Sequence, residues 1–144
     1  MPNRNLRDVV AHQEIVGIPP TASVRDAAVR MVEARVGAIL VIDGDRLAGI
    51  FTERDLLNRV VARGLDPDTT RLAEVMTPDP QTAAPDMPLT AALAMMAEGC
   101  YRHLPVVDGK RLLGTVSARD AFGQELAELE SELERRDRLT ELMI

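Results

Sequence analysis

One seven-residue pattern occurs twice in this chain, 65 positions apart, and it constrains the fold more than any other feature. The first copy is Gly49–Asp55 (GIFTERD) and the second is Gly114–Asp120 (GTVSARD). Each copy consists of glycine, two strand-forming residues, a hydroxyl residue, one variable residue, arginine and aspartate. We therefore expect each copy to end a strand, to begin a helix, and to present a hydroxyl and a carboxylate to a ligand.

The pattern belongs to a longer internal duplication. Residues 20–55 align with 85–120 without a gap, and twelve of these 36 positions are identical. Such self-similarity indicates two copies of one structural unit. We place the first repeat at 5–64, the second repeat at 65–122 and a C-terminal helical extension at 123–144. Halves of about 60 residues are marginal alone, so we expect them to share one core.

Each repeat reads as strand, helix, strand, strand, helix. The expected elements of the first repeat are a short helix at 5–13 (with a counterpart at 71–76), a strand at 15–18, a helix capped by Ser23, strands at 36–42 and 46–51, and a helix from 52 to 63. In that last helix, we expect an inward face of Leu56, Leu57, Val60 and Val61. The predicted fold class is α+β, with two βαββα repeats packed with pseudo-twofold symmetry and a long C-terminal helix.

The C-terminal extension has a leucine seam and an acidic character. Phe122, Leu126, Leu129 and Leu133 recur at spacings of 4, 3 and 4, and residues 121–144 have a net charge of −4. We expect a helix from Ala118 to Met143, about 39 Å long. Its seam can serve self-association or the binding of another protein, and the sequence does not favour one over the other.

Composition excludes several classes of function. The net charge of −6 disfavours nucleic-acid binding, which needs a basic surface. A single cysteine, Cys100, excludes an intrachain disulfide and fits a reducing, cytoplasmic environment. The apolar runs are too short to cross a membrane, and the N-terminus does not resemble a signal peptide. Sixteen arginines against one lysine suggest a bacterial coding sequence.

The chemistry of the repeated pattern has two explanations. A helix N-terminus attracts phosphate, and a carboxylate one turn inside can accept hydrogen bonds from both hydroxyls of a cis-diol. The preceding glycine would let a ligand approach the backbone. However, Thr52 with Asp55 and Ser117 with Asp120 also have the spacing of capping boxes, which stabilise a helix without any ligand. The two roles are compatible.

Together these motifs resemble a tandem pair of CBS domains, also called a Bateman module. The resemblance includes both copies of the pattern, the strand-and-turn segments Val41–Gly44 and Leu104–Gly109, and the linker Val75–Pro78 (VMTP). It covers about residues 5–122. The chain therefore looks like a stand-alone CBS-pair protein.

The resemblance implies a regulatory module that binds adenosine-containing ligands in clefts between the two repeats. Those ligands are AMP, ADP, ATP, S-adenosylmethionine or NADH. For ribose and phosphate, the implied residues are Thr52, Arg54, Asp55, Arg102, His103, Ser117, Arg119 and Asp120. For adenine, they are Ala22, Ala27, Gly37, Ala38, Met87, Ala92 and Tyr101. The family also implies a homodimer formed through helical faces.

The two copies differ in one respect, since Arg102-His103 stands where the first repeat has Gly37-Ala38. We expect the second site to prefer ligands with more phosphate, although an exposed loop explains the pair equally well. Elsewhere, we expect Cys100 to be a buried small hydrophobe and His12 to be exposed and inert.

No catalytic or metal-binding motif is evident, so we expect neither enzymatic activity nor a required cofactor or metal. The leading hypothesis is a nucleotide sensor that passes a conformational change to a partner. The alternative is a ligand-free structural or interaction protein that acts through dimerisation and its C-terminal helix.

Overall fold

The computed structural model describes residues 4–120 and 123–143, which form two compact units. Unit 1 comprises Met1–Gln13, Thr82–Gly109 and Leu113–Ile144, and unit 2 comprises Glu14–Gln81 and Lys110–Leu112. The units therefore differ from the sequence repeats, because the N-terminal segment packs with the second repeat.

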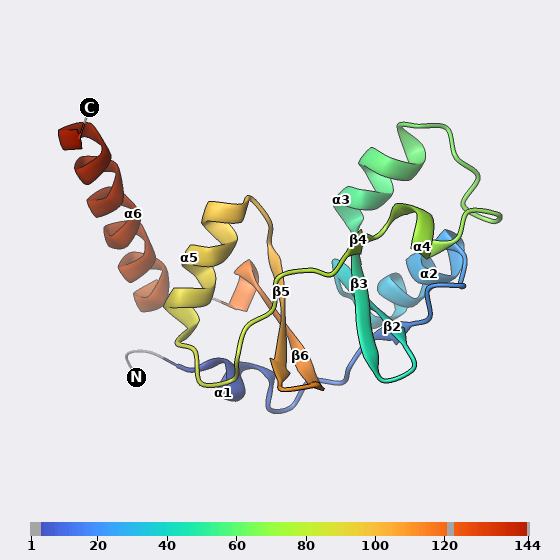
Figure 1. The fold of residues 1–144 in the computed structure, drawn as a ribbon, viewed down its shortest axis with the longest axis horizontal. Helices are drawn as coiled ribbons and strands as arrows, with labels where there is room; N and C mark the ends of the chain where they lie inside the picture. The colour runs from blue at the N-terminus through green and yellow to red at the C-terminus, as the bar shows by residue number, and fades with distance from the viewer. Residues whose placement is uncertain (1–3, 121–122, 144) are drawn as a thin grey trace. The chain divides into compact units, whose positions relative to one another are not determined.

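Unit 2 contains a four-stranded sheet in the order β1-β2-β3-β4 (Figure 1). Strand β1 is parallel to β2, and the other neighbours are antiparallel. The parallel pair is joined through α2, which gives the first three elements of the predicted βαββα repeat. The elements of unit 2 are β1 (Gly17–Ile18), α2 (Val24–Ala34), β2 (Ala38–Asp43), β3 (Arg46–Thr52), α3 (Glu53–Asp55), the π-helix η1 (Leu56–Val61), α4 (Leu72–Val75) and β4 (Thr77–Pro78).

Unit 1 repeats this plan with a smaller sheet. An isolated parallel bridge joins Ala83 to Val106, which are the counterparts of Ile18 and Val41 in the register of β1 with β2. The α+β architecture predicted from the duplication is thus confirmed. The elements that lie wholly or mainly in unit 1 are α1 (Leu6–Val10), α5 (Leu89–Gly99), β5 (His103–Asp108), β6 (Arg111–Ser117, of which Arg111 and Leu112 belong to unit 2), the 3₁₀ turn η2 (Ala118–Asp120) and α6 (Gly123–Met143).

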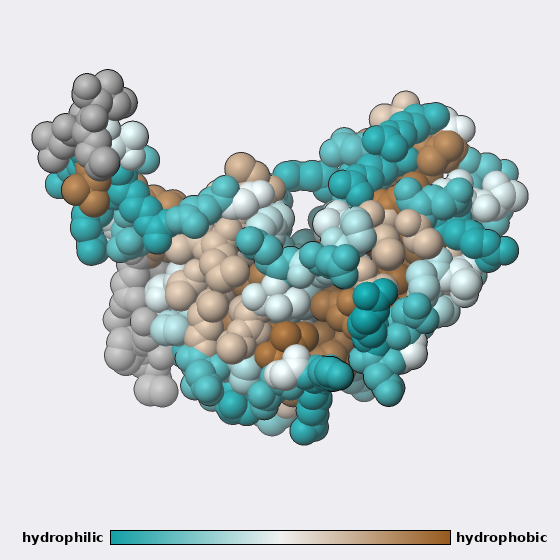
Figure 2. Space-filling model, viewed as in Figure 1, coloured by the Kyte–Doolittle hydropathy of each residue, from teal (hydrophilic) through white to brown (hydrophobic). Residues whose placement is uncertain are grey.

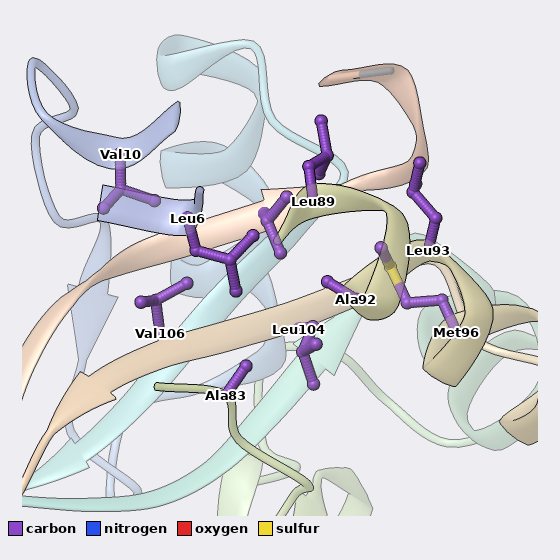
Figure 3. Packing of buried hydrophobic residues seen from close by; sticks show 10 residues of the cluster. Leu6, Val10, Ala83, Leu89, Ala92, Leu93, Met96, Leu104 and Val106 are labelled. Carbon is purple, nitrogen blue, oxygen red and sulfur yellow. The ribbon is translucent and has the colours of Figure 1, made fainter. Parts of the chain in front are cut away.

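Helix α1 closes the core of unit 1. Asn5 caps it by accepting a hydrogen bond from the Asp8 N–H group, at 3.1 Å. Leu6 and Val10 are four residues apart, so both lie on one side of the helix. They are 0% and 5% exposed and point into a cluster that Figure 3 shows with side chains from α5 and β5. The N-terminal helix is therefore a core element of the second repeat.

The helix after Thr52 differs from its prediction. After α3 the backbone adopts the π-helix η1, whose hydrogen bonds run from residue i to i+5 and change which side chains share a face. Val60 and Leu56 pack on the core of unit 2, but Leu57 and Val61 are 60% and 63% exposed. The prediction that all four face inward was therefore wrong for Leu57 and Val61.

Helix α6 lies beside α5, as Figure 1 shows, and Leu129 packs against the core of unit 1. Arg136 forms an ion pair with Glu98 of α5. The predicted helical start at Ala118 is instead the 3₁₀ turn η2. Phe122 and the Leu126 side chain lie outside the described residues, so that part of the leucine seam stays a prediction.

Two single-residue predictions have opposite outcomes. His12 is exposed, as expected. Cys100 is also exposed, so the prediction of a buried thiol was wrong. Cys100 ends α5 in the left-handed conformation, with φ of 58°, and Arg35 ends α2 in the same way. Within the described part of the chain, no helix has the length and apolarity needed to span a membrane.

Candidate functional site

The first copy of the repeated motif forms a closed capping box. The Thr52 Oγ1 atom accepts from the Asp55 N–H group at 3.1 Å, and the Asp55 Oδ2 atom accepts from the Thr52 N–H group at 3.0 Å. The Asp55 side chain is 13% exposed, so its carboxylate is held in one place. The capping role is therefore present in the structure, and it orients the carboxylate that a ligand would meet.

The second copy has related but different geometry. The Asp120 Oδ2 atom accepts from the Ser117 N–H group at 2.7 Å and lies 3.5 Å from Ser117 Oγ. The segment is a 3₁₀ turn, where the first copy begins an α-helix. In addition, the Arg4 guanidinium donates to the Asp120 carbonyl oxygen. Each copy thus brings together a hydroxyl and a carboxylate, but the backbone conformation and the neighbouring hydrogen bonds differ between the two copies.

Each motif is joined to the loop before the central strand of its own repeat. The Glu53 N–H group donates to the Gly37 carbonyl oxygen at 3.0 Å, and the Ala118 N–H group donates to the Arg102 carbonyl oxygen at 3.0 Å. These are equivalent bonds in the two repeats. They place Gly37 and Arg102 next to the helix starts, as the predicted sites require.

A third segment completes each cluster. In unit 2, the Leu72 N–H group donates to the Ala22 carbonyl oxygen at 3.0 Å; in unit 1, the Leu6 N–H group donates to the Met87 carbonyl oxygen at 2.9 Å. Ala22 and Met87 are partly exposed, as is Ala38, which pairs with Thr52 across the sheet. We call the unit 2 cluster half-site 1 and the unit 1 cluster half-site 2.

The remaining predicted residues vary in exposure. Arg54, Arg102 and Arg119 are exposed, and His103 is partly buried at the start of β5. Tyr101 is also partly buried, and this burial raises the pKa of its phenol.

Two of the predicted adenine-contact residues lie in the cores. Ala27 is 0% exposed in the core of unit 2, and Ala92 is 0% exposed in the core of unit 1. Their side chains have no surface to offer to a ligand, so we leave both out of the proposed sites.

The motif glycines make room for the chain itself. A β-carbon on Gly49 would lie 2.6 Å from Met76 Sδ and 2.7 Å from the Thr77 carbonyl oxygen. A β-carbon on Gly114 would lie 2.7 Å from Gln13 Oε1. Our expectation that these glycines admit a ligand is therefore corrected, because segments of the same unit occupy the space beside them.

Three side chains near the motifs were missed by sequence reasoning. Arg59 lies with its Nε atom 3.6 Å from Asp55 Oδ1. Gln13 exchanges two hydrogen bonds with the backbone of Thr115, at 2.9 and 3.1 Å. Arg4 contacts Asp120 as described above. The i,i+4 spacing of Asp55 and Arg59 was a signal for the first contact, whereas nothing local indicated that residues 4 and 13 lie beside the second motif.

The described residues include no group of histidine, cysteine, aspartate and glutamate side chains arranged to hold a metal ion. The arrangement instead offers, in each unit, a hydroxyl, a carboxylate and backbone groups at a helix start. Such groups suit a small polyhydroxyl ligand that carries an anion.

Comparison with known proteins gives a consistent result. The family model for the CBS domain matches residues 6–62 and 72–124. A CBS domain-containing protein of Arabidopsis thaliana is 42% identical over 95 residues, a match that covers 66% of this chain and 18% of that relative. The chain thus spans less than a fifth of that relative's length.

Two solved structures extend the comparison. A CBS domain protein from Pyrobaculum aerophilum complexed with AMP is 28% identical, with a TM-score of 0.79 over 89% of this chain and 99% of that one. A hexameric CBS-CP12 protein from bloom-forming cyanobacteria is 29% identical, with a TM-score of 0.78 over 96% of this chain and 86% of that one.

Proposed function

The chain belongs to the CBS-domain family, and from this premise we propose that it is a non-catalytic regulatory module that binds adenosine-containing nucleotides. The observation that carries the proposal is the pair of half-sites, each with a hydroxyl and an oriented carboxylate. AMP in the related Pyrobaculum aerophilum protein supports the choice of ligand class. That the nucleotide lies between the two repeats stays a prediction.

In the proposed complex, the ribose hydroxyls donate to Asp55 or Asp120, and the phosphate approaches the adjoining helix start. Half-site 2 has two nearby cations, because Arg102 is bonded through its backbone to Ala118 and Arg4 contacts Asp120, whereas half-site 1 has Arg59 beside Asp55. The aligned residues of half-site 1 include the neutral Gly37. We therefore propose that half-site 2 prefers nucleotides with more phosphate.

Titration calorimetry with AMP, ATP, NADH and S-adenosylmethionine tests the proposal. We expect measurable binding of at least one of them, and a loss of about tenfold or more in affinity for Asp55→Ala or Asp120→Ala at the altered site, because hydrogen bonds to a charged group contribute about 1.5–3 kcal/mol. Arg102→Ala should weaken ATP binding more than AMP binding.

Asp86→Ala is a matched control, since Asp86 is an exposed carboxylate whose described ion pair is with Arg7. It should bind as the wild type does. The absence of heat from all four nucleotides would contradict the sensor function and favour the ligand-free interaction module instead.

Apolar side chains on the outer helices of unit 2 support the proposal that the chain forms a homodimer. Val29 and Val32 of α2 are 48% and 77% exposed, and Leu57 and Val61 of η1 are 60% and 63% exposed. Figure 2 shows a small apolar patch among mainly hydrophilic residues at the upper right, in the region where Figure 1 draws the helix that follows α3. We propose that these four residues, the open helical face, contact the same face of a second copy.

The internal duplication supports this assignment. In unit 1, the position of Val29 is taken by Ala94, which is 7% exposed, and α6 lies along α5. At the Val29 position, unit 2 therefore exposes an apolar side chain where unit 1 buries a smaller one. The hexameric cyanobacterial relative is a further indication that chains of this fold self-associate.

Val32→Glu tests the proposed dimer. A carboxylate placed in an apolar contact must be desolvated, so we expect the variant to elute as a monomer at concentrations where the wild type is a dimer. Light scattering coupled to size-exclusion chromatography measures this change. Leu139→Glu is the control, because Leu139 is 56% exposed on α6. Dissociation of the Leu139 variant alone would place the interface on α6.

A further inference from the structure

Arg59 lies between the aspartate of half-site 1 and the end of α4. Its Nε atom is 3.6 Å from Asp55 Oδ1, and its Nη1 atom donates to the carbonyl oxygens of Val75 at 3.2 Å and Met76 at 3.0 Å. The last carbonyl groups of a helix have no partner within the helix and favour a cation. One guanidinium group therefore joins the motif carboxylate to the end of α4.

The segment that Arg59 holds is the linker through which the chain leaves unit 2. We define this linker as Val75–Asp79. Its centre, β4, pairs with Ile50 and Gly49 of β3, and the Asp79 N–H group donates to the Ala48 carbonyl oxygen at 3.1 Å. From Thr82 to Gly109 the chain belongs to unit 1. Arg59 thus contacts the start of the linker, and the rest of the linker pairs with β3.

The second repeat does not encode the same connection. The residue aligned with Arg59 is Gln124, which has no charge with which to pair with Asp120. The segment aligned with the linker is residues 9–13, which end the first stretch of unit 1 before the chain enters unit 2 at Glu14, so the difference between the repeats lies in the missing cation. The contact between carboxylate, guanidinium and linker is therefore a feature of half-site 1.

We propose that Arg59 is a positioning residue that transmits nucleotide binding at Asp55 to the linker. The inference rests on the proposed function, in which ribose hydroxyls donate to Asp55. Because Oδ2 already accepts from Thr52, a ribose hydroxyl competes with Arg59 for Oδ1. The guanidinium then bonds to the Val75 and Met76 carbonyls alone, and the linker is held more firmly. By thermodynamic reciprocity, a firmly held linker strengthens nucleotide binding.

Hydrogen exchange of the full chain, measured residue by residue with and without saturating AMP, tests the proposal. The reporters are the Met76 amide, which donates to Leu72 O at 2.8 Å, and the Asp79 amide. In the wild type, AMP should slow the exchange of both by about fivefold or more, the lower range of coupling between two sites. In Arg59→Met, AMP should still give heat in calorimetry, but the two amides should no longer respond.

Two further variants separate coupling from a merely structural role. Arg63→Met removes an exposed cation one turn later, so it should keep the wild-type response to AMP. Arg59→Lys keeps the charge but not the planar fork, so it should retain only part of the response.

The outcomes that overturn the inference differ from those that overturn the function. If AMP binds but the linker amides do not respond, or respond equally in Arg59→Met, the transmission role of Arg59 is wrong while nucleotide binding stands. If neither AMP nor the other nucleotides bind the wild type, the proposed function fails, and the inference fails with it.

Discussion

Replacing Phe51 by alanine is expected to lower the free energy of unfolding by about 3–5 kcal/mol, the usual cost of removing a buried aromatic ring. Phe51 is 0% exposed and is the largest fully buried side chain among the residues that the structure describes. It lies opposite Ile39 in the register of β3 with β2, in the core of unit 2. Urea unfolding followed by circular dichroism measures the loss.

The Phe51 variant should also lose nucleotide binding at half-site 1, because the next residue along β3, Thr52, begins the capping box. Leu139→Ala is the matched control. It removes a large apolar side chain that is 56% exposed and lies outside the open helical face, so it should change the free energy of unfolding by less than about 0.5 kcal/mol. A loss below about 1 kcal/mol for Phe51→Ala would mean that the core of unit 2 is misassigned.

Gly49→Ala should destabilise the protein by about 1–3 kcal/mol, as expected when atoms are forced into a well-packed site. The added methyl group would lie 2.7 Å from the Thr77 carbonyl oxygen, a backbone atom that cannot move without disturbing the pairing of β4 with β3. Faster hydrogen exchange at Asp79 should accompany the loss of stability.

Gly17→Ala provides the comparison for this glycine. Its new methyl group would meet Ile42 Cδ1 at 2.5 Å, but that atom ends a flexible side chain and can rotate away. We expect less than half of the destabilisation of Gly49→Ala. Equal costs at the two positions would show that the close approach of the linker to β3 is not what requires glycine at position 49.

Much of this fold followed from the internal duplication. Alignment at one constant offset predicts equivalent hydrogen bonds in the two repeats, and the structure has them at Gly37 and Arg102. Ser23 accepts from the Asp26 N–H group at 3.1 Å, so it caps the helix as expected. These features depend on residues close in sequence, which is why local patterns predict them.

What the sequence did not predict depends on contacts between distant segments or on backbone detail. The pairing of Arg4 with Asp120 joins residues 116 positions apart. The π-helix η1 was missed because the spacing of Leu56, Leu57, Val60 and Val61 fits an ordinary helix. Cys100 was assigned to the core from its apolar neighbours, although alignment with Arg35 placed it at an exposed helix end.

For the same reason, the sequence predicted the motif residues of the site but not the residues that contact them from distant segments. The oriented carboxylates lie within a motif of seven residues, so their geometry could be anticipated. The role proposed for Arg59 depends on its hydrogen bonds to the carbonyl oxygens of Val75 and Met76, which lie beside it only in the folded chain. The i,i+4 spacing of Asp55 and Arg59 is compatible with a helix-stabilising pair, but nothing in it indicates that Arg59 contacts the linker.

The path of the chain also sets an order of assembly during synthesis. Most of unit 2 comes from one continuous stretch, Glu14–Gln81, whereas α1 packs with segments that begin at Thr82. Leu6 and Val10 can be buried only after Leu89 and Val106 have been made. Domains usually form in the order in which they leave the ribosome. Here α1 must wait, with its apolar side uncovered, until α5 and β5 have been made.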